Sequence, residues 1–174
     1  MFFIICCFGS VFSWLNAPIQ AFLRPALWIP GLRSFHRKKE RWQWKEDPEC
    51  TFRRVREALA VLEMRFYEHY GYRNIKVAKV DADQLFIRAY FLTPRMQWLD
   101  VVELQFECGE HSGTSVKAHS FSSGVLPVCI PFAFLLNMLL FFFPFSDWGQ
   151  NKKRLLLIRK VATIEPEIEY LSNC

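Results

Sequence analysis

The most regular pattern in this 174-residue chain is helical and runs over residues 51–70. Apolar side chains recur there at spacings of three and four, at Phe52, Val55, Leu59, Leu62 and Phe66. Arginine and glutamate fill the other side. Thr51 can cap the start of this helix and Gly71 its end. The pattern predicts an amphipathic helix that buries one face.

Strand-like alternation follows this helix in four stretches, at residues 74–80, 84–92, 98–106 and 114–121. The links between them are short, which predicts an antiparallel meander. A last helix is expected from residue 147, because Asp147 can cap it and Gln150 follows three residues later. We therefore expect an α+β fold over residues 51–174: a helix, a four-stranded antiparallel sheet, an apolar insertion helix and a C-terminal helix, with the helices on one face of the sheet.

Two stretches carry no charged side chain, residues 1–23 and 120–146. In the first, an apolar run of about 14 residues is shorter than the roughly 20 that a membrane-spanning helix needs. Asn16, Pro18 and Gln20 interrupt it, and no basic residue precedes Arg24, so a cleaved signal peptide is not expected. Residues 1–35 are interpreted as an apolar N-terminal segment that anchors the chain or lies in the membrane interface.

The second stretch contains an apolar insertion at residues 125–145. Pro131 and Pro144 leave an uninterrupted helix of about 13 residues, too short to cross a bilayer. Apolar side chains cover every side of this helix, and a sheet can cover only one of them. We expect contact with lipid, another chain or the first segment through Phe132, Phe134, Leu135, Leu139, Phe142 and Phe143.

Residues 36–50 form a basic and polar linker in this interpretation. The net charge of +5 is concentrated there and just before, in Arg33, Arg37, Lys38, Lys39 and Arg41. A membrane surface fits this cluster, and the positive-inside rule would place the domain on the cytosolic side. Nucleic acid is not favoured as a partner, because no recognition helix, zinc spacing or RNP-like strand accompanies the charge.

Asp100 is the most conspicuous polar residue, because strand alternation places it on the same side as Val102 and Leu104. A buried carboxylate needs a partner, and the candidates are Arg154, Lys117 and Arg88. Cys108 and His111 have a spacing that suits zinc, with His119 and Asp100 as possible further ligands, but a glycine-rich turn explains the pair better. We expect no catalytic residue, metal, cofactor or disulfide framework.

Two motifs make the chain similar to the family catalogued as domain of unknown function 1499. Residues 98–104 resemble its acidic strand signature, with Val101 in place of the second aspartate. Residues 116–124 and then Asp147, Gly149, Asn151 and Arg154 resemble its serine-rich strand and Asp-x-Gly-x-Asn-x-x-Arg motif. In simpler members of the family these pieces lie close together, whereas the apolar insertion separates them here. The resemblance implies no established activity, substrate or cofactor.

The leading functional hypothesis is a membrane-associated, non-catalytic domain that binds lipid or a membrane protein through its apolar insertion. An enzyme or small-ligand receptor is a first alternative, with a site formed by Asp100, His119, Asp147, Asn151 and Arg154. A subunit of a membrane complex is a second alternative. The oligomeric state stays open. We also predict that Asn151 and Arg154, three residues apart on one helix, converge on Asp100 or on the strand ends beside it.

Overall fold

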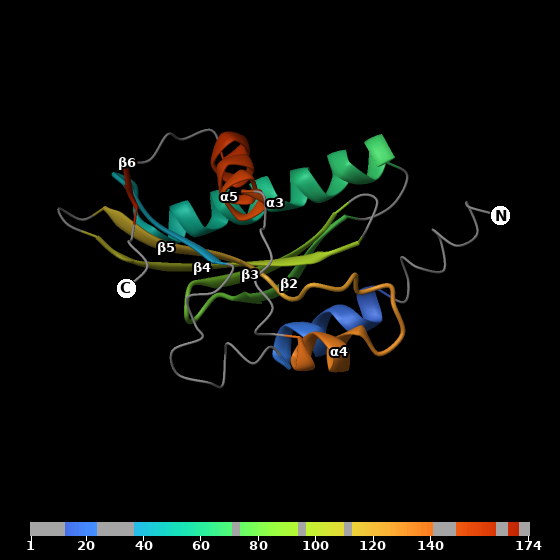
Figure 1. Cartoon of the computed structure of the whole chain (residues 1–174). Helices are drawn as coiled ribbons and strands as arrows, with labels where there is room; N and C mark the ends of the chain where they lie inside the picture. Colours follow the sequence, from blue (N-terminus) through green and yellow to red (C-terminus); the bar gives the residue numbers. More distant parts are fainter. Residues whose placement is uncertain are drawn as a thin grey trace.

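An antiparallel sheet forms the centre of the computed structural model, which describes residues 13–23, 37–70, 74–93, 97–109, 113–140, 149–162 and 167–170. The sheet has six strands in the order β2-β3-β4-β5-β1-β6 (Figure 1). Their bounds are β1 Arg37–Trp44, β2 Ile75–Asp81, β3 Phe86–Leu92, β4 Leu99–Cys108, β5 Thr114–Ser122 and β6 Glu167–Tyr170. The α+β class and the antiparallel meander from β2 to β5 are confirmed.

The expectation of only four strands is wrong, because β1 and β6 extend the sheet beyond β5. Residues 37–44, interpreted above as linker, form β1 and pair along their whole length with β5. The many charged side chains of this strand kept its sequence from showing the apolar alternation typical of a strand. Its inward positions include Glu40, Trp42 and Trp44, and three of the four outward positions Arg37, Lys39, Arg41 and Gln43 are basic. An alternation that includes a buried glutamate does not stand out as an apolar pattern.

Helices α3 (Pro48–Tyr70) and α5 (Gln150–Val161) cover one face of the sheet (Figure 1). The expected helix at 51–70 is therefore confirmed, and it begins three residues earlier. Asp47 caps it, because the backbone N–H of Glu49 donates to Asp47 Oδ2 at 3.0 Å. Thr51 is not the cap, and its hydroxyl donates to the Asp47 carbonyl. Gly71 lies outside the described residues.

The main core lies between this face and the two helices. It contains Trp42 from β1, Leu59 from α3 and Leu155 from α5, and it includes alternate positions of β3, β4 and β5. Those alternate positions are Ile87, Ala89, Phe91, Val102, Leu104, Phe106, Val116 and Ala118. The amphipathic pattern of residues 51–70 predicted that one face of α3 would be buried, and this face lies in the main core.

The opposite face of the sheet is also covered, so the expectation that all helices share one face is wrong. A helix at residues 13–22 and α4 (Ala133–Leu139) lie there, drawn in blue and orange in Figure 1. A second apolar cluster joins this helix to the sheet through Ala17, Ala21, Tyr90, Leu92, Leu99, Val101, Phe121 and Val128. Near Leu92 of β3, Leu99 of β4 and Phe121 of β5, apolar side chains lie on both faces of the sheet. Both faces must therefore be buried there.

Helix α4 is shorter than the 13-residue helix expected from the sequence, and it begins after Phe132, whose φ of 58° is left-handed. Helix α5 begins at Gln150, after Gly149 with φ 71°, rather than at residue 147. Phe142, Phe143 and Asp147 lie outside the described residues. Among the described residues no helix is long and apolar enough to cross a membrane.

Candidate functional site

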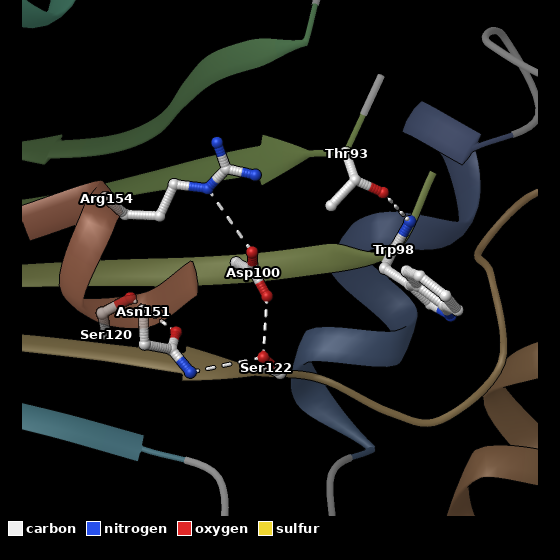
Figure 2. Close-up of polar contacts among 7 residues, drawn as sticks. All are labelled: Thr93, Trp98, Asp100, Ser120, Ser122, Asn151 and Arg154. Atoms are coloured by element: carbon white, nitrogen blue, oxygen red, sulfur yellow. Dashed lines mark hydrogen bonds and ion pairs between the residues drawn. The ribbon is translucent and has the colours of Figure 1, made fainter. Parts of the chain in front are cut away.

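A buried group of polar side chains connects β4, β5 and α5 (Figure 2). Arg154 Nε donates to Asp100 Oδ2 at 3.4 Å, and Ser122 Oγ donates to Asp100 Oδ1 at 2.7 Å. The strand register brings the serine there, since Ser122 is directly opposite Asp100. The side chains of Arg154 and Asp100 are only 11% and 4% exposed, so both charges are largely removed from water. The ion pair expected between Asp100 and Arg154 is therefore present.

Asn151 extends this group toward the start of α5. Ser120 Oγ donates to Asn151 Oδ1 at 2.7 Å, and Asn151 Nδ2 donates to Ser122 Oγ at 3.3 Å. The guanidinium carbon of Arg154 also lies 5.4 Å from the centroid of the Phe91 ring. We call the group of Asp100, Ser120, Ser122, Asn151 and Arg154 the polar clasp. These hydrogen bonds tie α5 to the sheet, which is a structural role.

The other two candidate partners of Asp100 are engaged elsewhere. Lys117 Nζ lies 2.6 Å from Glu107 Oε1, and Arg88 Nη2 lies 2.8 Å from Glu103 Oε1. Asp147 is outside the described residues, so its place relative to the polar clasp stays a prediction. Gly149 directly precedes α5, where its left-handed backbone suits a residue without a Cβ.

His119 does not join the polar clasp, because it lies on the opposite face of the sheet. It is directly opposite Glu103, and its Nδ1 is 3.7 Å from Glu103 Oε2. Its ring centroid lies 5.2 Å from that of Phe121, with the two rings tilted by 49°, and Phe121 belongs to the second apolar cluster. The grouping of His119 with Asp100, Asn151 and Arg154 in one ligand site is therefore wrong, since the sheet separates them.

Burial lowers the pKa of His119, and the nearby charges of Arg37 and Lys39 act in the same direction. The hydrogen bond and negative charge of Glu103 oppose this shift without reversing it. For Glu103 itself burial raises the pKa, but His119 and Arg88 outweigh burial, so the net pKa is lowered. These directions describe a neutral imidazole beside an ionised carboxylate at neutral pH.

Metal ligation has little support among the described residues. Cys108 ends β4 in an exposed position, and His111 lies outside the described residues. Asp100 and His119 are on opposite faces of the sheet. The described residues contain no group of three or more His, Cys, Asp and Glu side chains arranged to hold a metal ion.

The helix at residues 13–22 has an unusual distribution of side chains. Its buried side includes the polar residues Ser13, Asn16 and Gln20 beside two small alanines. The Ser13 hydroxyl donates to Gln97 Oε1, Asn16 Nδ2 donates to the Val128 carbonyl at 3.4 Å, and Gln20 Nε2 donates to Ser123 Oγ at 2.8 Å. The exposed side of the same helix carries Leu15, Ile19 and Phe22. The helix is thus polar and small inside and apolar outside.

Helix α4 repeats this inverted distribution. Its buried side consists of Ala133 and Asn137. The amide of Asn137 binds the backbone of Leu126 twice, accepting from its N–H at 2.7 Å and donating to its carbonyl at 3.1 Å. Gly124 lies directly against this amide, where a Cβ would come within 2.3 Å of Asn137 Cγ. A polar contact therefore fixes α4 to the preceding loop.

The outer sides of both helices expose large apolar side chains. The exposed fractions are 65% for Leu15, 61% for Phe22, 66% for Phe132 and 63% for Leu139. We call the set of Leu15, Ile19, Phe22, Phe132, Leu135, Leu136 and Leu139 the outer apolar surface. Of the insertion residues predicted to contact lipid, Phe132, Leu135 and Leu139 belong to it, whereas Phe134 is half-buried. Trp98 is partly exposed, and its indole N–H donates to the Val125 carbonyl, which precedes α4 in the chain, at 2.8 Å.

Strand alternation divides the predicted basic cluster between two faces. Arg37 and Lys39 are opposite Phe121 and His119 and therefore share the face of the two outer helices. Arg41 follows on the same face. Lys38 is opposite Ser120 of the polar clasp and belongs to the α5 side. Arg33 lies outside the described residues.

Comparison with known proteins adds little to this geometry. No family model and no curated protein matches the chain. A solved structure, titled as the crystal structure of Ara h 8.0201, superposes with a TM-score of 0.40 and 10% identity, over 73% of this chain and 94% of that chain. At that level the likeness carries no argument about function.

Sequence reasoning missed the buried polar residues of the outer helices, above all Asn16, Gln20, Asn137 and the contacting Gly124. One signal was available. Asn16 and Gln20 are four residues apart, as are Ala133 and Asn137, so each pair marks one side of a helix that is otherwise apolar. In a segment without charges, the polar side of a helix is the side that faces the rest of the protein, not the side that faces solvent.

Proposed function

We propose that this protein is a membrane-associated, non-catalytic domain that inserts its outer apolar surface into the interface of a lipid bilayer. The observation that carries the proposal is the inverted distribution of side chains on two separate helices. In water a surface helix buries its apolar side, and the polar side faces solvent. Helices that face lipid do the opposite, with small and polar residues toward the protein. The helix at 13–22 and α4 both follow the second pattern.

The geometry supports interfacial insertion rather than crossing. Both helices are short and lie over one face of the sheet (Figure 1), so their apolar sides can enter the headgroup and upper acyl region together. Full burial of a Leu or Phe side chain is worth about 1.5–3 kcal/mol. A few such side chains are enough for reversible binding. The cytosolic face of the membrane is proposed as the location because basic residues follow the apolar N-terminal segment.

Two further parts of the interpretation stay proposals. Membership of the domain of unknown function 1499 family rests on the motif residues Asp100, Asn151 and Arg154, which meet in the polar clasp, and no family model supports it. A subunit of a membrane complex would use the same outer apolar surface against a protein partner. The hydrogen bonds among the clasp side chains support a structural role for this group rather than a small-ligand site.

Vesicle flotation tests the proposal with the full-length chain and phosphatidylcholine vesicles. The parent should float with the vesicles, and Leu135→Gln with Leu139→Gln should weaken binding at least about tenfold, because two inserted side chains are lost. The matched control is Met64→Gln with Leu156→Gln, which removes side chains that are 63% and 39% exposed on α3 and α5. This control should bind as the parent does.

The proposal fails if the parent stays with the unbound fraction and remains dispersed without detergent. A parent that ignores vesicles but co-purifies with a stoichiometric partner, lost in the Leu135→Gln, Leu139→Gln variant, would favour the membrane-complex subunit instead.

A further inference from the structure

We infer that the outer apolar surface selects loosely packed bilayers, in which strong curvature spreads the headgroups apart, over flat and tightly packed ones. This inference rests on the proposed membrane function and specifies the kind of membrane that the surface recognises. It follows from two properties of the helix at 13–22 and α4. They carry no charged side chain, and their polar side chains are held on the inner side by hydrogen bonds to the rest of the protein.

The polar groups of the two outer helices are directed away from the membrane side. Residues 13–23 and 125–140 contain no Asp, Glu, Lys or Arg. Asn16, Gln20 and Asn137 are buried, and each side-chain amide donates a hydrogen bond to a group of the protein itself. The outer apolar surface therefore presents hydrocarbon and aromatic groups to a lipid, and it binds by apolar insertion rather than by recognising a headgroup.

Two tryptophans beside these helices follow the same arrangement. Tryptophans of the membrane interface commonly lie at headgroup depth with the indole N–H on the polar side. Here the indole nitrogen of Trp14 is buried, and the indole N–H of Trp98 donates to the Val125 carbonyl at 2.8 Å. Neither N–H is directed at a headgroup, so these rings also contribute apolar contact.

The outer apolar surface is formed before it meets a membrane. The amide of Asn137 fixes α4 to the backbone of Leu126 by two hydrogen bonds, and Asn16 and Gln20 hold the helix at 13–22. A segment that folds on binding has to be ordered at that moment, which weakens its affinity, whereas a preformed surface avoids this cost. The affinity of this protein is then determined mainly by the work of making room among the lipids.

The exposed parts of the outer side chains set the size of the effect. Leu15, Phe22, Phe132 and Leu139 are between 61% and 66% exposed. Burying the exposed part of one such side chain in hydrocarbon changes the affinity about tenfold. Binding by interfacial helices is sensitive to curvature, because spread headgroups leave gaps over the acyl chains. A curved leaflet that admits one more of these side chains than a flat one should therefore be bound at least about tenfold more tightly.

The test compares the full-length chain on small sonicated and large extruded vesicles of the same phosphatidylcholine, at equal accessible lipid. Both vesicles present the same headgroups, so a cation such as Lys76, whose Nζ lies 5.8 Å from the centroid of the Trp14 ring, meets the same chemistry on each. The parent should bind the small vesicles at least about tenfold more tightly. Adding dioleoylglycerol, whose small headgroup opens similar gaps, should strengthen binding to the large vesicles.

The variant Leu15→Ala with Leu139→Ala shortens one exposed side chain on each outer helix. It should bind the small vesicles at least about tenfold more weakly than the parent does, because less apolar surface enters the gaps. The matched control is Met64→Ala with Leu156→Ala, which shortens side chains that are 63% and 39% exposed on α3 and α5. This control should keep both the affinity and the preference of the parent.

Equal affinity of the parent for small and large vesicles would overturn the inference while leaving the proposed function intact. A parent that binds neither removes both. Equal losses in the variant and the control would also contradict the inference, because the outer apolar surface would then not be responsible for the preference. Should the variant on the outer helices fail to fold, the dioleoylglycerol series with the parent decides, and binding to large vesicles that does not rise along it contradicts the inference.

Discussion

Gly124 and Asn137 are in direct contact, and the contact leaves no room for a side chain on the glycine. A Cβ at position 124 would lie 2.3 Å from Asn137 Cγ and 2.5 Å from both terminal atoms of the amide. The amide cannot move away freely, because both atoms are bonded to the backbone of Leu126. This relationship fixes α4 against the body of the protein, and with it part of the outer apolar surface.

Gly124→Ala is therefore expected to destabilise the protein by about 1–3 kcal/mol, as overpacking of a filled site does. Asn137→Ala should also destabilise, because Leu126 loses two hydrogen bonds. Once the amide is absent the added methyl group has space, so the double variant should be no less stable than Asn137→Ala alone. Thermal melts of the parent and the three variants measure this non-additivity, and strictly additive losses would contradict the contact.

Arg154→Ala should cost about 3 kcal/mol, because Asp100 then remains buried with Ser122 as its bonded neighbour. Arg154→Lys should be intermediate, since an ammonium has neither the planar fork nor the stacking on Phe91. Lys153→Ala, an exposed neighbour on the same helix, is the control and should stay within about 0.5 kcal/mol of the parent. Urea unfolding measures these differences. An Arg154→Ala variant as stable as the control would contradict the structural role of the polar clasp.

Glu40 provides a second buried charge that sequence reasoning did not identify. Its carboxylate is fully buried, accepts from the Trp42 indole N–H at 2.9 Å and lies 3.9 Å from Arg159 Nη2. Arg159→Met should cost about 3 kcal/mol because the carboxylate loses its counter-charge. Adding Glu40→Gln to this variant should recover most of the loss, whereas Lys160→Met on the exposed side of α5 should have little effect. Denaturant titrations test this, and a double variant less stable than Arg159→Met would contradict it.

His119 should make stability depend on pH in the acid range. Its folded-state pKa is lowered from the ordinary value of 6.5, so below pH 6.5 the unfolded chain binds more protons than the folded one. The free energy of unfolding should therefore fall as the pH drops below about 6.5 and through the folded-state pKa. Burial, Glu103, Arg37 and Lys39 act on the ring and set the size of the effect.

His119→Gln should flatten this dependence between pH 7 and pH 5, as measured by chemical unfolding at each pH. Glu103, with its lowered pKa, adds its own loss of stability only at more acidic pH, through the range below 4.5. A parent whose stability is the same at pH 7 and pH 5 would show that the imidazole does not titrate as described.

Part of the candidate site could be read from local pattern. Because side chains alternate along a strand, Asp100 had to share a face with Val102 and Leu104, and the helical spacing of Asn151 and Arg154 aimed both at one place. These two local patterns together predicted that Arg154 would meet Asp100. The place of His119 did not, because the face it shares with Glu103 depends on the register between β4 and β5, which is set by the turn between them.

The sequence alone determined the elements whose periodicity is strong and local: the helix that became α3, the strands β2 to β5, and the presence of two apolar segments without charge. Only the tertiary structure decided that residues 37–44 enter the sheet and that helices cover both of its faces. The physical reason is that β1, the helix at 13–22 and α4 bury polar side chains, and only contacts with neighbouring elements make this burial favourable. Glu40 is inside because Trp42 and Arg159 meet it, and Asn16, Gln20 and Asn137 are inside because backbone and side-chain partners from distant parts of the chain satisfy them.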